Sequence, residues 1–93
     1  MTIEQDRADA LTIARIEIDN IDNDIIDLLM RRMVKARHAR YLHPASAGDL
    51  EYVDDYDREL AVLVRYSKRL MPWVSSSEVH ELCSALFRMS RPS

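Results

Sequence analysis

Apolar residues recur along the first part of the chain in steps of three and four, within a stretch from about Leu11 to about Leu42 that holds no Pro or Gly. This spacing is typical of one face of a helix and predicts a long first helix over about residues 9–42. At about 1.5 Å per residue, such a helix is roughly 45 Å long or more, so we expect it to pack against a copy of itself. We call its leading face the apolar seam, formed by Leu11, Ala14, Ile18, Ile21, Ile25 and Leu28.

Two shorter helices are predicted after a loop at residues 43–49, where Pro44 and Gly48 interrupt helical geometry. The second helix is predicted over about residues 54–71. Its acidic beginning and basic end both suit the helix dipole. The third is predicted over about residues 76–90, with a capping box formed by Ser75 and Glu78 and one apolar stripe formed by Val79, Cys83, Leu86 and Ser90.

The composition favours a single all-α domain over residues 1–93, because 47% of the residues are apolar and only one Gly and three Pro are present. A domain of this size buries a modest share of its surface, which makes a dimer a natural route to stability. The lone cysteine, Cys83, cannot form an internal disulfide, and no Cys-His spacing suggests zinc or another metal. The sequence shows neither a secretion signal nor a membrane-spanning run, so we expect a cytoplasmic protein.

The net charge of −3 argues against a dedicated nucleic-acid binder, since affinity for phosphates requires a basic excess. The charge is nevertheless unevenly distributed. Residues 31–43 hold five Lys or Arg, two His and no acid, whereas residues 49–59 hold six acids and one Arg. A nucleic-acid role resting on the basic stretch would require salt-dependent binding to DNA or RNA.

Arg32 stands where the apolar seam calls for another apolar residue, followed on the same face by Ala36, Ala39 and His43. An arginine that reaches solvent from the rim of a core, or one paired with an acid, would satisfy this position. A guanidinium facing small alanines is also how a carboxylate site is built, because alanine leaves room for the ligand. Arg32 is therefore the leading candidate for an anion-binding residue.

Further polar candidates lie on all three helices. Arg15 precedes Arg32 by 17 residues, about 25 Å along the helix, so the two cannot bind one small ligand within a single subunit. In an antiparallel dimer Arg15 could instead enter the partner's site. The other candidates are Ser90 on the third helix and a trio on one face of the second helix, Asp55, Arg58 and Glu59, which could equally be surface ion pairs.

The order of these features resembles the all-helical chorismate mutase family. The resemblance spans Leu11 to about Ser90 and is carried by order and spacing, not by one diagnostic motif. The closest stretches are Ala14-Arg15-Ile16-Glu17-Ile18-Asp19-Asn20-Ile21-Asp22 and Asp55-Tyr56-Asp57-Arg58-Glu59.

The resemblance implies an intertwined, domain-swapped homodimer with two equivalent active sites and no cofactor or metal. Arg32 and the partner's Arg15 would bind the two carboxylates of the substrate, with Arg58 nearby. Asp55 and Glu59 would hold the ring hydroxyl, and Ser90 would lie close to a carboxylate. His43 stands at the position of the family's lysine, which donates to the ether oxygen of the substrate, and the family's glutamine donor would fall past Ser93.

The function implied is the pericyclic rearrangement of chorismate to prephenate, an isomerase step of the shikimate pathway toward aromatic amino acids. Two alternatives keep the fold and change the substrate: an isochorismate-pyruvate lyase and a mutase of 4-amino-4-deoxychorismate. A third alternative is a helical dimer without catalysis that binds a ligand or a partner protein. No residue type distinguishes these four functions, so they stay open at the level of the sequence.

Overall fold

The chain forms three helices, and no strand occurs in the part that the structure describes. The computed structural model describes residues 2–42 and 49–91, and it describes side chains for residues 2–42 and 56–91. The helices are α1 (Ile3–Leu42), α2 (Asp49–Leu70) and α3 (Ser76–Ser90). The predicted all-α class with one long and two shorter helices is confirmed.

Helix α1 begins six residues before the predicted start. The hydroxyl of Thr2 accepts a hydrogen bond from the backbone N–H of Gln5 over 3.1 Å, which caps the first turn. Glu4 and Asp6 add negative charge where the helix dipole is positive. The prediction was wrong here because it started the helix at the apolar repeat, whereas the helix starts at its polar cap.

Helix α2 begins at Asp49, five residues before the predicted start, and ends at Leu70, one residue before the predicted end. The helix therefore begins at the first residue of the acidic stretch 49–59 and not within it. The bounds of α3 agree with the prediction. The predicted loop position His43 lies outside the described residues.

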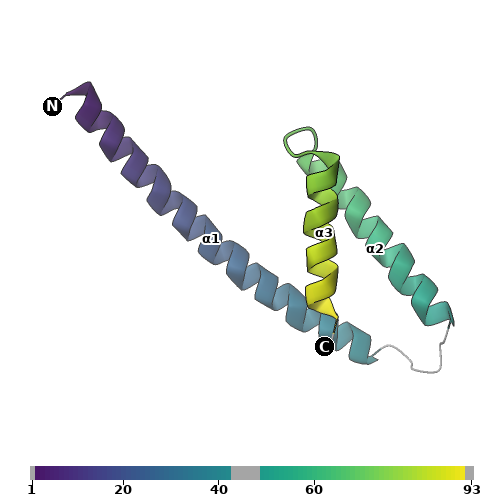
Figure 1. Ribbon diagram of the computed structural model, residues 1–93. Coiled ribbons are helices and arrows are strands. Elements are labelled where there is room, and N and C mark those ends of the chain that lie inside the picture. Colours follow the sequence, from purple (N-terminus) through teal and green to yellow (C-terminus); the bar gives the residue numbers. More distant parts are fainter. Residues whose placement is uncertain (1, 43–48, 92–93) are drawn as a thin grey trace. The chain divides into compact units, whose positions relative to one another are not determined.

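Helices α2 and α3 pack against each other, as Figure 1 shows. The buried apolar side chains of the described residues are Val62 on α2 and Val79, Cys83 and Leu86 on α3. Val79 is completely buried. With Ser90, the three apolar residues of α3 form the stripe predicted from the sequence, and these four are the buried residues of that helix. The Cys83 thiol is free and buried.

Helix α1 contains no buried residue among those described. Its apolar seam is about half exposed, from 46% at Ile25 to 56% at Ile21 and Leu28. Ile13, Ile16 and Ile26, which lie outside the seam, are equally exposed. The chain divides into two compact units, Met1–Arg32 and Met33–Ser93, and the only helix in the first unit, over the described residues, is the part of α1 up to Arg32. A helix with apolar residues on several faces is normally covered by other helices.

The start of α3 is held by the predicted capping box. The Ser75 hydroxyl accepts a hydrogen bond from the backbone N–H of Glu78 over 3.2 Å, and the Glu78 carboxylate accepts one from the backbone N–H of Ser75 over the same distance. The Ser75 hydroxyl also donates to that carboxylate over 2.7 Å. These hydrogen bonds from Ser75 lower the pKa of Glu78 below its usual 4.5.

Replacing Ser75 by Ala is expected to lower the free energy of unfolding by about 1 kcal/mol at neutral pH. A lowered pKa means that the stabilising contribution of Glu78 is present at pH values above about 4.5 and is lost as pH falls through the folded-state pKa. Urea unfolding of both proteins at pH 7 and pH 3 tests this. Ser76→Ala, at the neighbouring position, is the matched control, and an equal loss for Ser75→Ala at both pH values would contradict the role of the carboxylate.

Candidate functional site

The C-terminal end of α3 and the middle of α2 meet at an ion pair. Arg91, the first residue after α3, donates from Nη2 to Glu59 Oε1 over 2.8 Å and to Oε2 over 3.3 Å. The side chain of Glu59 is 25% exposed and that of Arg91 is 51% exposed. Glu59, a predicted site residue, is therefore partly buried and paired with a cation that the sequence did not single out.

The guanidinium of Arg91 uses only one of its nitrogens for this pair. Among the described residues, all of its side-chain hydrogen bonds come from Nη2. A guanidinium carries five N–H donors in a fixed plane, so the N–H groups of Nη1 and Nε stay open to a ligand. Glu59 thus orients the guanidinium of Arg91, and the N–H groups of Nη1 and Nε make no hydrogen bond to the described residues.

Ser90 is buried next to Arg91, with 7% of its surface exposed. Its hydroxyl donates to the backbone carbonyl of Leu86 over 2.7 Å, a bond within α3. The Ser90 hydroxyl is therefore bound to the last turn of its own helix. In this arrangement Ser90 fixes the last turn of α3, which positions Arg91 beside Glu59.

A second cation reaches the same end of α3 from α1. Arg37 donates from Nη2 to the backbone carbonyl of Met89 over 3.1 Å. Carbonyls in the last turn of a helix lack helical partners and carry partial negative charge, so a guanidinium there stabilises the helix end. Arg37 and Arg91 both belong to the unit Met33–Ser93, so this end of α3 carries two positive charges.

The sequence reasoning missed Arg37 and Arg91. Arg37 follows Arg32 by five residues and lies about 140° round the helix from it, so the seam did not include it. Arg91 directly follows the predicted site residue Ser90, and this adjacency in the sequence was the signal that could have identified it. Neither contact can be found by periodicity, because each joins residues far apart in the chain.

The other predicted residues of this unit lie on α2. Arg58 is exposed and directly precedes Glu59. Asp55 lies one turn before both residues, and its side chain is outside the described part of the chain. The spacing therefore places Asp55, Arg58 and Glu59 along adjacent turns of one helix, as predicted.

Arg15 and Arg32 belong to the unit Met1–Arg32. Arg15 is exposed, whereas Arg32 is half-buried. Both lie on the uninterrupted helix α1, so the separation of about 25 Å expected from 17 helical residues applies. One small ligand cannot contact both arginines of the same chain.

No group of three or more His, Cys, Asp or Glu side chains among the described residues could hold a metal ion. None of the helices, over the residues described, is both long and apolar enough to cross a membrane. Comparison of the chain with models of protein families, with curated proteins and with solved structures yields no match. The chemistry of the side chains therefore carries the functional argument.

Proposed function

We propose that this protein is a cytoplasmic, homodimeric isomerase of the chorismate mutase type, which rearranges chorismate to prephenate on the route to aromatic amino acids. The observation that carries the proposal is the pairing of Glu59 with Arg91 beside Ser90. An acceptor for a ring hydroxyl and a cation for the ether oxygen or a carboxylate would then lie in one place. The resemblance to the all-helical chorismate mutases assigns Glu59 and Ser90 to the same site.

The substrate is a dicarboxylate, and the proposal assigns its two charges to arginines. Arg32 and Arg15 of the partner subunit bind one carboxylate each, and Arg58 adds positive charge nearby. Guanidinium groups suit this task because they bind carboxylates through two parallel hydrogen bonds. The distance of about 25 Å between Arg15 and Arg32 supports a site shared between two chains.

The remaining roles follow the same resemblance. Asp55 and Glu59 accept from the ring hydroxyl, and His43 stands where the family has its lysine. A histidine is only partly protonated near neutral pH, so it is a weaker cation than lysine. A second donor for the ether oxygen would compensate for this difference, and Arg91 is the cation next to the substrate-binding acid Glu59.

The proposed reaction needs no nucleophile, metal or cofactor. A pericyclic rearrangement is accelerated by holding the substrate in its reactive conformer and by donors aimed at the atom where negative charge develops. That atom is the ether oxygen, whose bond to the ring breaks as the new carbon–carbon bond forms. We assign the donor role to the N–H groups of Arg91 that Glu59 leaves unused.

Replacing Arg91 by Ala is expected to lower kcat for chorismate about a hundredfold or more, as loss of one transition-state donor does in other enzymes. Because the donor acts as charge develops, KM should change much less than kcat. Arg91→Lys should recover part of the rate, and Arg88→Ala, which removes an exposed arginine of α3, should leave it unchanged. Equal rates for Arg91→Ala and the unsubstituted protein would exclude Arg91 from the reaction.

An assay of the purified protein with chorismate, isochorismate and 4-amino-4-deoxychorismate tests the proposal as a whole. Formation of prephenate supports it. Release of pyruvate from isochorismate, or turnover of the amino compound alone, would assign one of the related activities on the same fold. Binding of chorismate without turnover of any of the three would identify a ligand-binding dimer and overturn the enzymatic proposal.

A further inference from the structure

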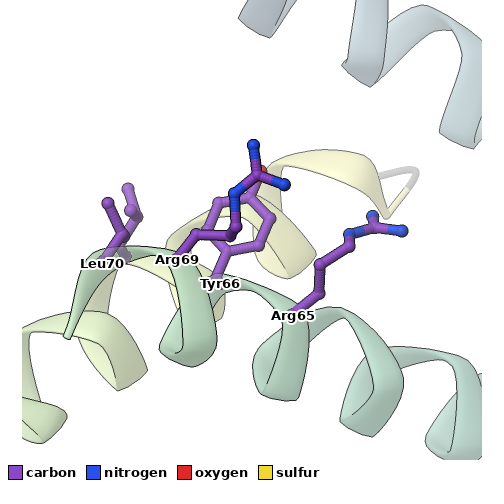
Figure 2. Close-up of a pocket in the computed structure, with 5 residues that line it drawn as sticks. Arg65, Tyr66, Arg69 and Leu70 are labelled. Atoms are coloured by element: carbon purple, nitrogen blue, oxygen red, sulfur yellow. The ribbon is translucent and has the colours of Figure 1, made fainter.

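Helices α2 and α3 border an open groove of about 390 Å³, lined by Arg65, Tyr66, Arg69, Leu70 and Leu82. All of these residues belong to the unit Met33–Ser93, so one compact unit forms the groove. Figure 2 shows the side chains of Arg65 and Arg69 extending from α2 on the same side as the ring of Tyr66. Sites for small molecules commonly have volumes of about 300–1,000 Å³, so the groove is large enough to hold one.

The apolar part of the groove comes from both helices. Tyr66 and Leu70 on α2 are half-buried, and Leu82 on α3 is 43% exposed. The buried residues Val62 and Val79 do not line the groove, which therefore lies beside the packed core and not inside it. A ligand can cover Tyr66, Leu70 and Leu82 without separating the two helices.

The charged part of the groove consists of Arg65 and Arg69, and no acid is among the residues that line it. Both arginines are exposed, and within the described residues neither makes a hydrogen bond or an ion pair. They lie one helical turn apart, so their side chains start about 5–6 Å from each other. Because each guanidinium carries several N–H donors, one carboxylate between them can accept hydrogen bonds from both.

Charge and apolar surface together define the ligand. An inorganic anion would pair with the arginines but would leave Tyr66, Leu70 and Leu82 in water. An uncharged hydrocarbon would cover these three side chains but would give the arginines no counter-ion. An aromatic ring that carries a carboxylate meets both requirements, because such a ring also packs well against the edge or face of a tyrosine. A cationic group on the ligand would be repelled by the two arginines.

We propose that this groove binds a small aromatic acid, with the carboxylate between Arg65 and Arg69 and the ring against Tyr66, Leu70 and Leu82. Arg65 and Arg69 follow Glu59 by six and ten residues, which is about 9 Å and 15 Å along α2. The groove is thus a second site, separate from the pairing of Glu59 with Arg91. The proposal goes beyond the proposed function and does not depend on it.

An NMR titration of the isotope-labelled protein with hydrocinnamate tests the proposed ligand class. The amide signals of residues 65–70 and of Leu82 are expected to shift and to saturate, with a dissociation constant of roughly 1 mM. Hydrocinnamamide, which has the same shape without the charge, should bind at least about threefold more weakly. Equal binding of the amide would overturn the role of the carboxylate. Inorganic phosphate that reproduces the same saturating shifts would reduce the groove to a general anion site and overturn the proposal.

Variants of the two arginines test where the carboxylate binds. Arg65→Gln and Arg69→Gln are each expected to raise the dissociation constant about three- to fivefold, and the double variant about tenfold or more, since exposed ion pairs are screened by water. Lys68→Gln is the matched control, because Lys68 is an exposed cation of the same helical turn that does not line the groove. Its affinity should change by less than about twofold. Equal losses from Lys68→Gln and Arg69→Gln would show that net charge attracts the ligand, and the proposed site would be wrong.

Leu82→Gln tests the apolar wall and is expected to weaken hydrocinnamate binding about threefold or more, since the ring loses an apolar neighbour. Leu82 is 43% exposed, and Gln is nearly as good a helix former as Leu, so α3 should stay folded. Circular dichroism of the variant checks this. Unchanged affinity in a folded Leu82→Gln protein would overturn the proposed position of the ring.

Arg91→Ala separates the groove from the catalytic proposal, because hydrocinnamate should bind this variant as it binds the unsubstituted protein. Saturating shifts at Glu59, Ser90 and Arg91, in place of those at residues 65–70, would overturn the groove as the site. Binding in the groove by a protein that turns over none of the three substrates supports the groove and overturns the function. Turnover of chorismate by a protein whose groove binds no hydrocinnamate supports the function and overturns the groove.

Discussion

Replacing Arg32 by Ala is expected to weaken the binding of chorismate about a hundredfold or more while the dimer stays folded. Each hydrogen bond to a charged group contributes about 1.5–3 kcal/mol, and a carboxylate held by two of them loses both. The apolar seam itself tolerates the change, because Ala has the highest helix propensity and removes a half-buried charge. Calorimetric titration with chorismate gives the loss of affinity, and circular dichroism with sedimentation shows whether the dimer persists.

The matched control for this prediction is Arg31→Ala. Arg31 is exposed and lies about 100° round α1 from Arg32, so its removal changes the net charge equally without touching the seam. Binding by this variant should fall only slightly, through the weaker long-range attraction of a dianion. Dissociation of the Arg32→Ala dimer, with retained affinity in whatever dimer remains, would show that Arg32 supports the fold rather than the ligand.

The fold was predictable where one local signal governed an element. The capping box of Ser75 and Glu78 fixed the start of α3, and the steps from Val79 to Ser90 identified its buried face. The buried face of α2 was harder to predict, because this helix carries apolar residues on several sides. Val62 is buried, whereas Leu60 and Val64 remain almost half exposed. Periodicity finds a helix with apolar residues on several sides, but only the position of α3 selects which side is buried against it.

The candidate site likewise combines features that local sequence predicts with features that only packing between helices determines. The spacing of Asp55, Arg58 and Glu59 follows from helical geometry alone, and the structure keeps them on one helix. The pairing of Glu59 with Arg91 joins residues 32 positions apart and depends on how α2 packs against α3. Arg37 likewise finds the carbonyl of Met89 across 52 positions. Helical spacing thus predicted residues that share α2, whereas packing between helices brought Arg91 and Arg37 to the end of α3.

Helix α1 connects the fold to the proposed function. In one chain it buries none of its described residues, yet it carries large apolar side chains on the seam and outside it. A small protein that leaves so much apolar surface in water is expected to associate through it. The proposed dimer accounts for this exposure and for the position of Arg15, since the helix that brings the partner's Arg15 to the site is also the helix that lacks a cover.

Replacing Ile25 by Asp tests this connection and is expected to separate the dimer, raising its dissociation constant at least about a thousandfold. Ile25 lies on the apolar seam and is 46% exposed in a single chain. A dimer that covers the seam would bury the new carboxylate in both copies without a partner, at a cost of several kcal/mol. Sedimentation equilibrium measures the dissociation, and circular dichroism at the same concentrations should show a loss of helix, because α1 has no core of its own.

The same substitution in a protein that works as a monomer would change little, since the seam would already face water and surface substitutions usually alter the free energy of unfolding by less than about 0.5 kcal/mol. Asn23→Asp is the control, because it adds an equal charge roughly 160° round α1 from Ile25. Its expected cost is a few tenths of a kcal/mol from the neighbouring acids Asp19 and Asp27. A dimer that survives Ile25→Asp as well as it survives Asn23→Asp would show that the seam is not the interface, and the shared site would then lose the contact that brings the partner's Arg15 to it.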